Sequence, residues 1–152
     1  MTNTKKEALT IVGIAIRTSN EPGKGDTDIP QLWGRFRAEN ILGRIPHKVD
    51  NTVYAIYTDY EGDHTQPYTL VIGCNVSSLD NIPEDMTVKI IPESNYSQFI
   101  AKGDLTKGAV INTWMQIWAM DLNRTYATDM EIYDDRATDP TNGVAEILVG
   151  IQ

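Results

Sequence analysis

The feature that most constrains this chain is an order of predicted elements that occurs twice. Residues 9–19 are rich in Ile, Val and Thr, which is typical of a strand. A helix is expected over 28–43, with Asp28 as its N-cap, because apolar residues recur there at the spacing of one helical face. The strands expected at 52–60 and 68–77 flank a turn-rich segment, which predicts an antiparallel hairpin.

The second occurrence follows a break near Pro83. Strand segments are expected at 86–92 and 96–102, and a helix over 108–120. Two further strands are expected, over 128–133 and 144–151. Each half therefore contains the series strand, helix, strand, strand, although the two halves share little residue identity.

This duplicated pattern predicts one α+β domain over residues 1–152, with pseudo-repeat halves at about 8–80 and 85–152. We expect the two units to merge into an antiparallel sheet with two helices. A crevice between the halves is then the expected place for a ligand pocket.

The charge balance narrows the range of partners. The chain has 13 Lys and Arg against 21 Asp and Glu, a formal net charge of -8. Phosphate backbones and anionic membranes are held by concentrated positive charge, so we expect neither nucleic acid nor membrane as a partner of this chain alone. The apolar stretch 9–16 is too short for a membrane helix and has no convincing cleavage site after it. We therefore expect a cytoplasmic protein.

No catalytic or cofactor motif is present in the sequence. It contains no P-loop, no G-x-S-x-G and no H-E-x-x-H pattern. His47 and His64 lie in polar, turn-like segments without a second ligand at metal spacing. The single Cys74 is expected to be a buried apolar residue. We expect no catalytic residue, no metal and no cofactor.

The aromatic residues are mostly Tyr and Trp, which combine a large apolar face with a polar edge suited to a ligand site. Several fall where the two predicted helices and the first hairpin border the crevice. For Trp114 and Trp118, whose spacing is that of one helical face, the pattern alone favours packing in the core over contact with a ligand. The aromatic residues named here as candidate ligand contacts are Trp33, Tyr54, Tyr57, Tyr68, Trp114, Trp118 and Tyr133.

Glu131 is the candidate charged group. Strand alternation over 128–133 places it on one face with Asp129 and Tyr133, opposite Met130 and Ile132. Periodicity alone favours a solvated face. A buried carboxylate ringed by aromatic side chains would instead attract an organic cation, which would supply the missing countercharge.

Several segments together resemble the GyrI-like family of small-molecule-binding domains. In chain order they are IVGIAIRTSN, IPQLWGRF, IPHKVDNTVYAIYTDYEGD, YTLVIGCNVSS, IPEDMTVKIIPESNYSQFIAKG, WMQIWA and DMEIYDDR. Such domains occur at the C-termini of AraC-type and multidrug-responsive MerR-type bacterial activators. Some stand alone, including integron cassette proteins that bind cationic drugs. The resemblance implies the same duplicated fold and a pocket between its halves.

The resemblance also assigns site residues. The family's acidic pocket residue lies in a D-[FMY]-E-x-Y strand, which matches residues 129–133 and implies that Glu131 binds the cation. It further implies pocket positions for Trp33 and Tyr54. No helix-turn-helix precedes residue 9, so the DNA-binding role of a transcription regulator is not transferred.

Three functions stay open at this point. The first is a stand-alone, non-enzymatic module that senses or sequesters cationic, amphipathic, aromatic compounds through Glu131 and the aromatic walls. The second is a small hydrolase that uses Glu131 for proton transfer in the same pocket. The third is an acidic protein-interaction inhibitor acting on a partner such as DNA gyrase. A protein partner or a homodimer is possible with each of them.

Overall fold

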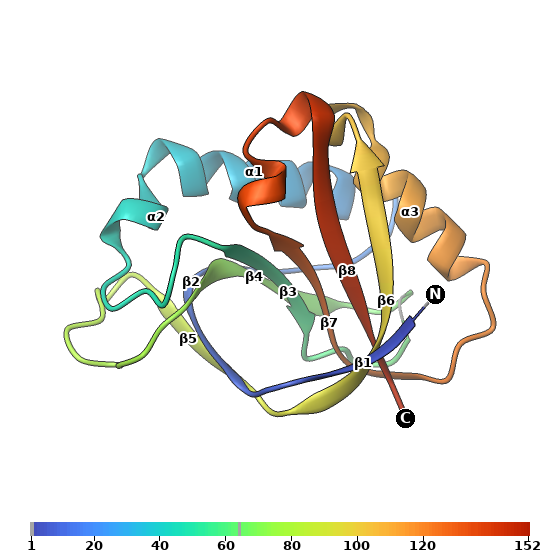
Figure 1. The fold of residues 1–152 in the computed structure, drawn as a ribbon, viewed down its shortest axis with the longest axis horizontal. Helices are drawn as coiled ribbons and strands as arrows, with labels where there is room; N and C mark the ends of the chain where they lie inside the picture. The colour runs from blue at the N-terminus through green and yellow to red at the C-terminus, as the bar shows by residue number, and fades with distance from the viewer. Residues whose placement is uncertain (1, 64) are drawn as a thin grey trace.

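The computed structural model describes residues 2–63 and 65–152, so His64 lies outside the described residues. These residues form one eight-stranded sheet with helices on one side (Figure 1). None of the described helices is long and apolar enough to cross a bilayer. The strands are β1 (Thr2–Lys6), β2 (Leu9–Thr18), β3 (Val53–Thr58), β4 (Tyr68–Asn75), β5 (Thr87–Ile91), β6 (Ser94–Gly103), β7 (Arg124–Tyr133) and β8 (Gly143–Ile151), and the helices are α1 (Gly25–Ala38), α2 (Ile41–Arg44) and α3 (Ala109–Trp118).

The strand order is symmetric about the central pair β7 and β3. It runs β1-β6-β8-β7-β3-β4-β2-β5, and every pairing is antiparallel. The edge strands are exchanged between the halves, because β1 pairs with β6 and β5 pairs with β2. This arrangement confirms the predicted α+β class with an antiparallel sheet.

The helices α1 and α3 cover the same face of the curled sheet, each over one half (Figure 1). The core under α1 includes Leu32, Phe36 and Ile72, and the core under α3 includes Ile117 and Ile147. Tyr57 and Tyr133 pack against both of these cores. The middle of this face, on β3 and β7, is therefore where the two halves meet.

The opposite face has its own core. Tyr54, Ile56, Met130 and Ile132 are buried there, together with residues of β2, β4, β5 and β6. Because side chains alternate along a strand, odd and even positions of β3 and β7 serve different cores. This alternation decides which of the predicted residues can reach a common site.

Two expected boundaries were wrong. Helix α1 begins at Gly25, and Asp28 lies inside it, where its carboxylate accepts a hydrogen bond from the Thr18 hydroxyl at 2.8 Å. The helix ends at Ala38 because Asn40 adopts a left-handed conformation, with φ of 49°. The last helical residues expected, 41–43, belong to α2.

Two stretches of strand were not expected from the sequence. Strand β1 consists of polar residues paired at the sheet edge, so no hydrophobic alternation marks it. Strand β7 begins at Arg124 rather than at residue 128. This earlier start brings Arg124 into the site described below.

Candidate ligand-binding site

A buried carboxylate, that of Glu131 on β7, lies at the meeting point of the two halves. Only 3% of this residue is exposed to solvent. One carboxylate oxygen accepts hydrogen bonds from the Tyr57 hydroxyl and the Trp114 indole N–H, both at 2.7 Å. The other accepts one from the Tyr133 hydroxyl at 2.6 Å. The solvated face that periodicity favoured is therefore wrong, because α3 and the tyrosines cover this side of β7.

Three elements position these donors. Tyr57 lies on β3, whose Ala55 pairs with Glu131, so the ring of Tyr57 projects from the same face as the carboxylate. Tyr133 is two residues further along β7 and shares that face. Trp114 comes from α3, where it is buried against β8 along with Ile117. Both halves of the fold therefore contribute to the environment of Glu131.

The surroundings of Glu131 favour its protonated, neutral form more than bulk water would. Burial raises the pKa of Glu131, and the three hydrogen bonds lower it only in part. No ion pair to Glu131 is formed within residues 2–63 and 65–152. Burial and the nearby carboxylate raise the pKa values of Tyr57 and Tyr133 well above the usual value, so both hydroxyls remain donors.

A second buried carboxylate lies two residues away, at Asp129, which is 0% exposed. Its oxygens accept hydrogen bonds from the Tyr60 hydroxyl at 2.5 Å, the Arg124 guanidinium at 2.8 Å and the Gly150 backbone N–H at 2.8 Å. The Arg124 ion pair compensates the charge of Asp129 inside the protein. Sequence reasoning assigned no role to this pair, although Asp129 shares the face of Glu131.

A pocket with an empty volume of about 390 Å³, part of it open to solvent, lies beside both carboxylates. Its walls come from both halves and carry two of the three donors to Glu131 and two of the three partners of Asp129. Ring contacts tie the walls together: the centroids of Tyr57 and Tyr68 are 5.5 Å apart, and those of Tyr57 and Trp114 5.6 Å apart. The lining residues are Asn20, Ile29, Tyr57, Tyr60, Tyr68, Ile111, Trp114, Trp118 and Arg124.

Glu131 itself is not among these lining residues, whereas Tyr57 and Trp114 both line the pocket and donate to its carboxylate. A molecule in the pocket therefore meets the faces or edges of these two rings first. The carboxylate acts on it from behind, through a medium of low polarity where charge is weakly screened.

Most of the candidate residues converge on this place. Tyr57, Tyr68, Trp114 and Trp118 line the pocket, and Trp114 is also part of the core. Tyr133 holds Glu131 from the side of α1. Trp33 does not line the pocket; its ring packs on that of Tyr133 at a centroid distance of 5.2 Å, in an edge-to-face arrangement.

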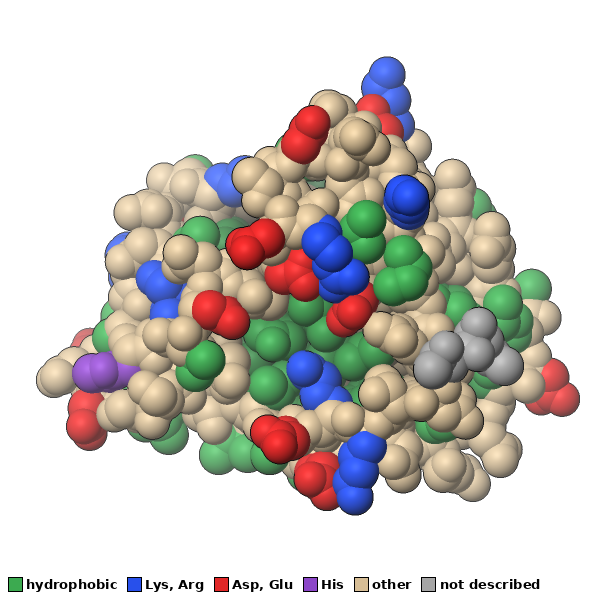
Figure 2. All heavy atoms as spheres, in the orientation of Figure 1, with side chains coloured by type: hydrophobic (Ala, Val, Ile, Leu, Met, Phe, Trp, Pro, Cys, Tyr) green, Lys and Arg blue, Asp and Glu red, His purple; other side chains and the backbone are tan. Residues whose placement is uncertain are grey.

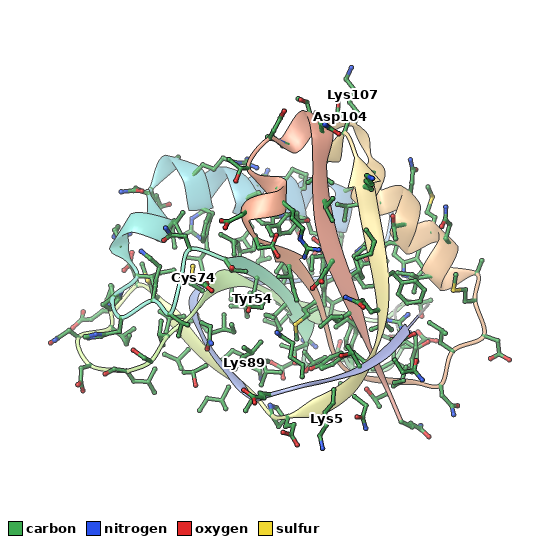
Figure 3. All side chains as sticks on the ribbon, in the orientation of Figure 1. Lys5, Tyr54, Cys74, Lys89, Asp104 and Lys107 are labelled. Carbon is green, nitrogen blue, oxygen red and sulfur yellow. The ribbon has the colours of Figure 1, made fainter. Side chains whose placement is uncertain are left out.

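Tyr54 lies elsewhere, and the expectation that it lines this pocket does not fit the structure. It is three residues before Tyr57, so strand alternation turns it to the opposite face of β3. There it is buried beside a different hollow, with the Lys6 ammonium 5.8 Å from its ring centroid. Figure 3 marks Tyr54 near the middle of the sheet, and Figure 2 shows apolar side chains gathered in the middle of the same view.

Sequence reasoning did not assign five of the lining residues: Asn20, Ile29, Tyr60, Ile111 and Arg124. Tyr60 lies two residues beyond β3, and Asn20 lies in the loop between β2 and α1. Asn20 accepts a hydrogen bond from the Tyr68 hydroxyl at 2.9 Å. Nothing in the sequence marked Arg124 as a site residue, because it precedes the part of β7 in which apolar and polar residues alternate.

Among the described residues, no group of three or more His, Cys, Asp or Glu side chains could hold a metal ion. The two buried carboxylates have separate sets of partners, with Glu131 bound by neutral donors and Asp129 by Arg124. What the arrangement offers chemically is an aromatic pocket with negative charge behind its wall.

The aromatic pocket between the two halves, under α1 and α3, is of the kind that small-molecule-binding domains have. The chain matches the Cass2 family, described as integron-associated effector binding protein, over residues 4–151. It belongs to this family. The resemblance to GyrI-like domains is thereby confirmed.

Several individual proteins are similar to this chain in sequence or in fold. YobU of Bacillus subtilis (strain 168), whose name marks it as a candidate transcriptional regulator, is 28% identical over 144 residues, covering 92% of this chain and 90% of YobU. An integron cassette protein from the mobile metagenome of Vibrio cholerae has a similar fold, with a TM-score of 0.76, 24% identity and coverage of 99% of this chain and 95% of that one. The structure of SAV2435 bound to tetraphenylphosphonium is also similar, with a TM-score of 0.82, 19% identity and coverage of 99% and 93%.

Proposed function

We propose that this chain binds cationic, amphipathic, aromatic compounds in the pocket between its halves, with Glu131 as the countercharge. The observation that carries the proposal is the environment of Glu131. Its carboxylate is buried, receives three neutral hydrogen bonds and has no cationic partner among the described residues. A buried charge of this kind is costly, and a bound cation would offset the cost.

The pocket walls suit the remainder of such a ligand. A cation lying against Tyr57 and Trp114 would gain on the order of 0.5–2 kcal/mol from each ring face, as well as the attraction of Glu131 behind them. Apolar parts of the ligand would contact Ile29, Ile111 and Trp118, and burial of apolar area contributes roughly 25 cal/mol per Å². The binding of tetraphenylphosphonium by SAV2435, which has a similar fold, supports this class of ligand.

The experiment is a calorimetric titration with tetraphenylphosphonium, whose charge does not change with pH. Glu131→Gln keeps the shape of the side chain and removes its charge, so we expect at least about a tenfold loss of affinity, equal to about 1.4 kcal/mol. The matched control is Glu93→Gln, which changes the net charge equally at an exposed site paired with Lys5. Equal affinities of the wild type and Glu131→Gln would contradict the proposal.

The proposal includes binding without chemical change of the ligand, and a cytoplasmic place of action. The first part is tested by incubating the protein with a carboxylic ester of a cationic aromatic compound and analysing the ligand by mass spectrometry. Full recovery of the ester is expected. Hydrolysis that disappears in Glu131→Gln would instead support the hydrolase.

A further inference from the structure

Arg124 has a buried N–H group, outside its ion pair, that lacks a hydrogen-bond partner among the described residues. The side chain is only 5% exposed and donates through one terminal nitrogen to Asp129. Its Nε–H is buried and has no hydrogen-bond partner among the described residues. A buried donor without an acceptor costs on the order of 1–3 kcal/mol, and such groups are rare in folded proteins. Arg124 is also one of the residues that line the pocket.

The backbone around Arg124 is built to hold it there. Arg124 pairs with Ile151 and Asp129 pairs with Val149, so residues 125–128 form a bulge opposite Gly150 alone. A Cβ atom at Gly150 would lie 2.6 Å from the Thr128 carbonyl oxygen, so no other residue fits there. Tyr126 in this bulge has a φ of 52°, an uncommon conformation for a residue other than glycine. The bulge folds Arg124 back over Asp129, and its guanidinium carbon lies 4.4 Å from the ring centroid of Tyr126.

The pocket therefore has two chemically different sides. On one side, Tyr57 and Trp114 carry the influence of Glu131, which lacks a cation. On the other side, Tyr60 and Arg124 form a cluster with Asp129 in which the charges cancel. A carboxylate on the ligand would meet two buried carboxylates near one guanidinium, so an uncharged acceptor fits this side better than an anion.

We propose that Arg124 is a specificity-determining residue, and that the preferred ligands are monocations carrying an uncharged hydrogen-bond acceptor, such as a carbonyl oxygen, at the end opposite the cationic group. The Nε–H of Arg124 donates to that acceptor while Asp129 retains the terminal nitrogen. This inference rests on the proposed function and refines its ligand class.

The test uses two phosphonium cations of equal charge and nearly equal shape. They are (4-acetylphenyl)triphenylphosphonium and (4-isopropenylphenyl)triphenylphosphonium, which differ by a carbonyl oxygen in place of a methylene group. The wild type is expected to bind the acetyl compound about tenfold more tightly, the ratio that a hydrogen bond from a charged donor gives. Affinities are measured by calorimetry with the full chain.

Arg124→Lys is the variant of choice, because it keeps a cation for Asp129 and places a methylene group where Nε stands. We expect its preference for the acetyl compound to fall to within about twofold, since the hydrogen bond is lost. Arg136→Lys is the matched control, because Arg136 pairs with Asp134 and Glu146 away from the pocket, and it is expected to keep the full preference.

The outcomes separate the two proposals. Equal binding of both cations by the wild type, or an unchanged preference in Arg124→Lys, would overturn the role of Arg124 and leave the cation site intact. Binding of neither cation by the wild type would overturn both proposals. In Glu131→Gln both affinities should fall while their ratio stays that of the wild type.

Discussion

Asp129 and Glu131 are two carboxylates on the same face of one strand, and both are buried. Asp129 is bound by the Arg124 guanidinium, the Tyr60 hydroxyl and a backbone N–H. Glu131 is bound by two tyrosine hydroxyls and an indole N–H, all of them neutral. The difference between the two sites is therefore the presence of a cation rather than burial or the number of hydrogen bonds.

The comparison shows how one strand, β7, can serve both the stability of the fold and the binding of a ligand. A buried charge that has its countercharge within the chain stabilises the arrangement around it, and removing either partner leaves a charge in an apolar place. A buried charge without a countercharge lowers stability and remains available to a cation from outside. We infer that Asp129 organises the bulge beside the pocket and that Glu131 serves the ligand.

The largest effect should come from breaking the Asp129 site. Arg124→Ala leaves Asp129 buried without a cation, so we expect a loss of about 3–5 kcal/mol in the free energy of unfolding. Glu131→Gln should change that free energy by less than about 1 kcal/mol, because the amide oxygen can accept from Tyr57 and Trp114 while the amide N–H donates to the Tyr133 hydroxyl oxygen. Chemical denaturation at neutral pH measures both values. A greater loss in Glu131→Gln than in Arg124→Ala would reverse the roles assigned to the two carboxylates.

A smaller effect is expected from removing one donor at Glu131. Tyr57→Phe keeps the ring that lines the pocket and removes the hydrogen bond to the carboxylate. With one donor fewer, the pKa of Glu131 rises further, so affinity for tetraphenylphosphonium should fall a few-fold at a pH within the range where Glu131 titrates. Titration of both proteins checks this, and a gain in affinity would count against the role of the hydrogen bond.

The smallest effect is expected at Tyr54, which is on the opposite face of β3. Tyr54→Phe should leave the affinity for tetraphenylphosphonium within about twofold of the wild type, because the hydroxyl does not contact the pocket. The same titration tests it alongside Tyr57→Phe. If Tyr54→Phe weakened binding more than Tyr57→Phe, the ligand would have to lie in the hollow beside Tyr54.

The sequence was sufficient to predict much of the fold, because β2, β3, β4 and β8 alternate or run apolar and α3 has a regular apolar face. It was insufficient for Glu131, since a charged residue between Met130 and Ile132 has the same pattern on a solvent face as under a helix. Only the resemblance to a family pointed to its burial. The side chains that cover Glu131, those of Trp114 and Tyr57, reach it only through tertiary packing.

The wrong placement of Tyr54 and the omission of Arg124 each have a physical reason. The odd spacing between Tyr54 and Tyr57 places them on opposite faces, so strand parity alone could have separated them. Arg124 reaches Asp129 because a bulge in β7 brings the two residues together. Such a bulge is not visible in hydrophobic periodicity. The pairing of Arg124 with Asp129 was thus missed because irregular backbone brings it about.

The most direct test of the central claim is the affinity for tetraphenylphosphonium as a function of pH, in the wild type and in Glu131→Gln. Burial raises the pKa of Glu131 above its ordinary value of 4.5, so lowering the pH protonates it in a window that begins above that value. Protonation removes the countercharge, and the wild-type affinity should fall through this window as the pH is lowered. Glu131→Gln should bind weakly with no such slope. A flat wild-type profile, or the same slope in both proteins, would contradict the claim that the ionised Glu131 binds the cation.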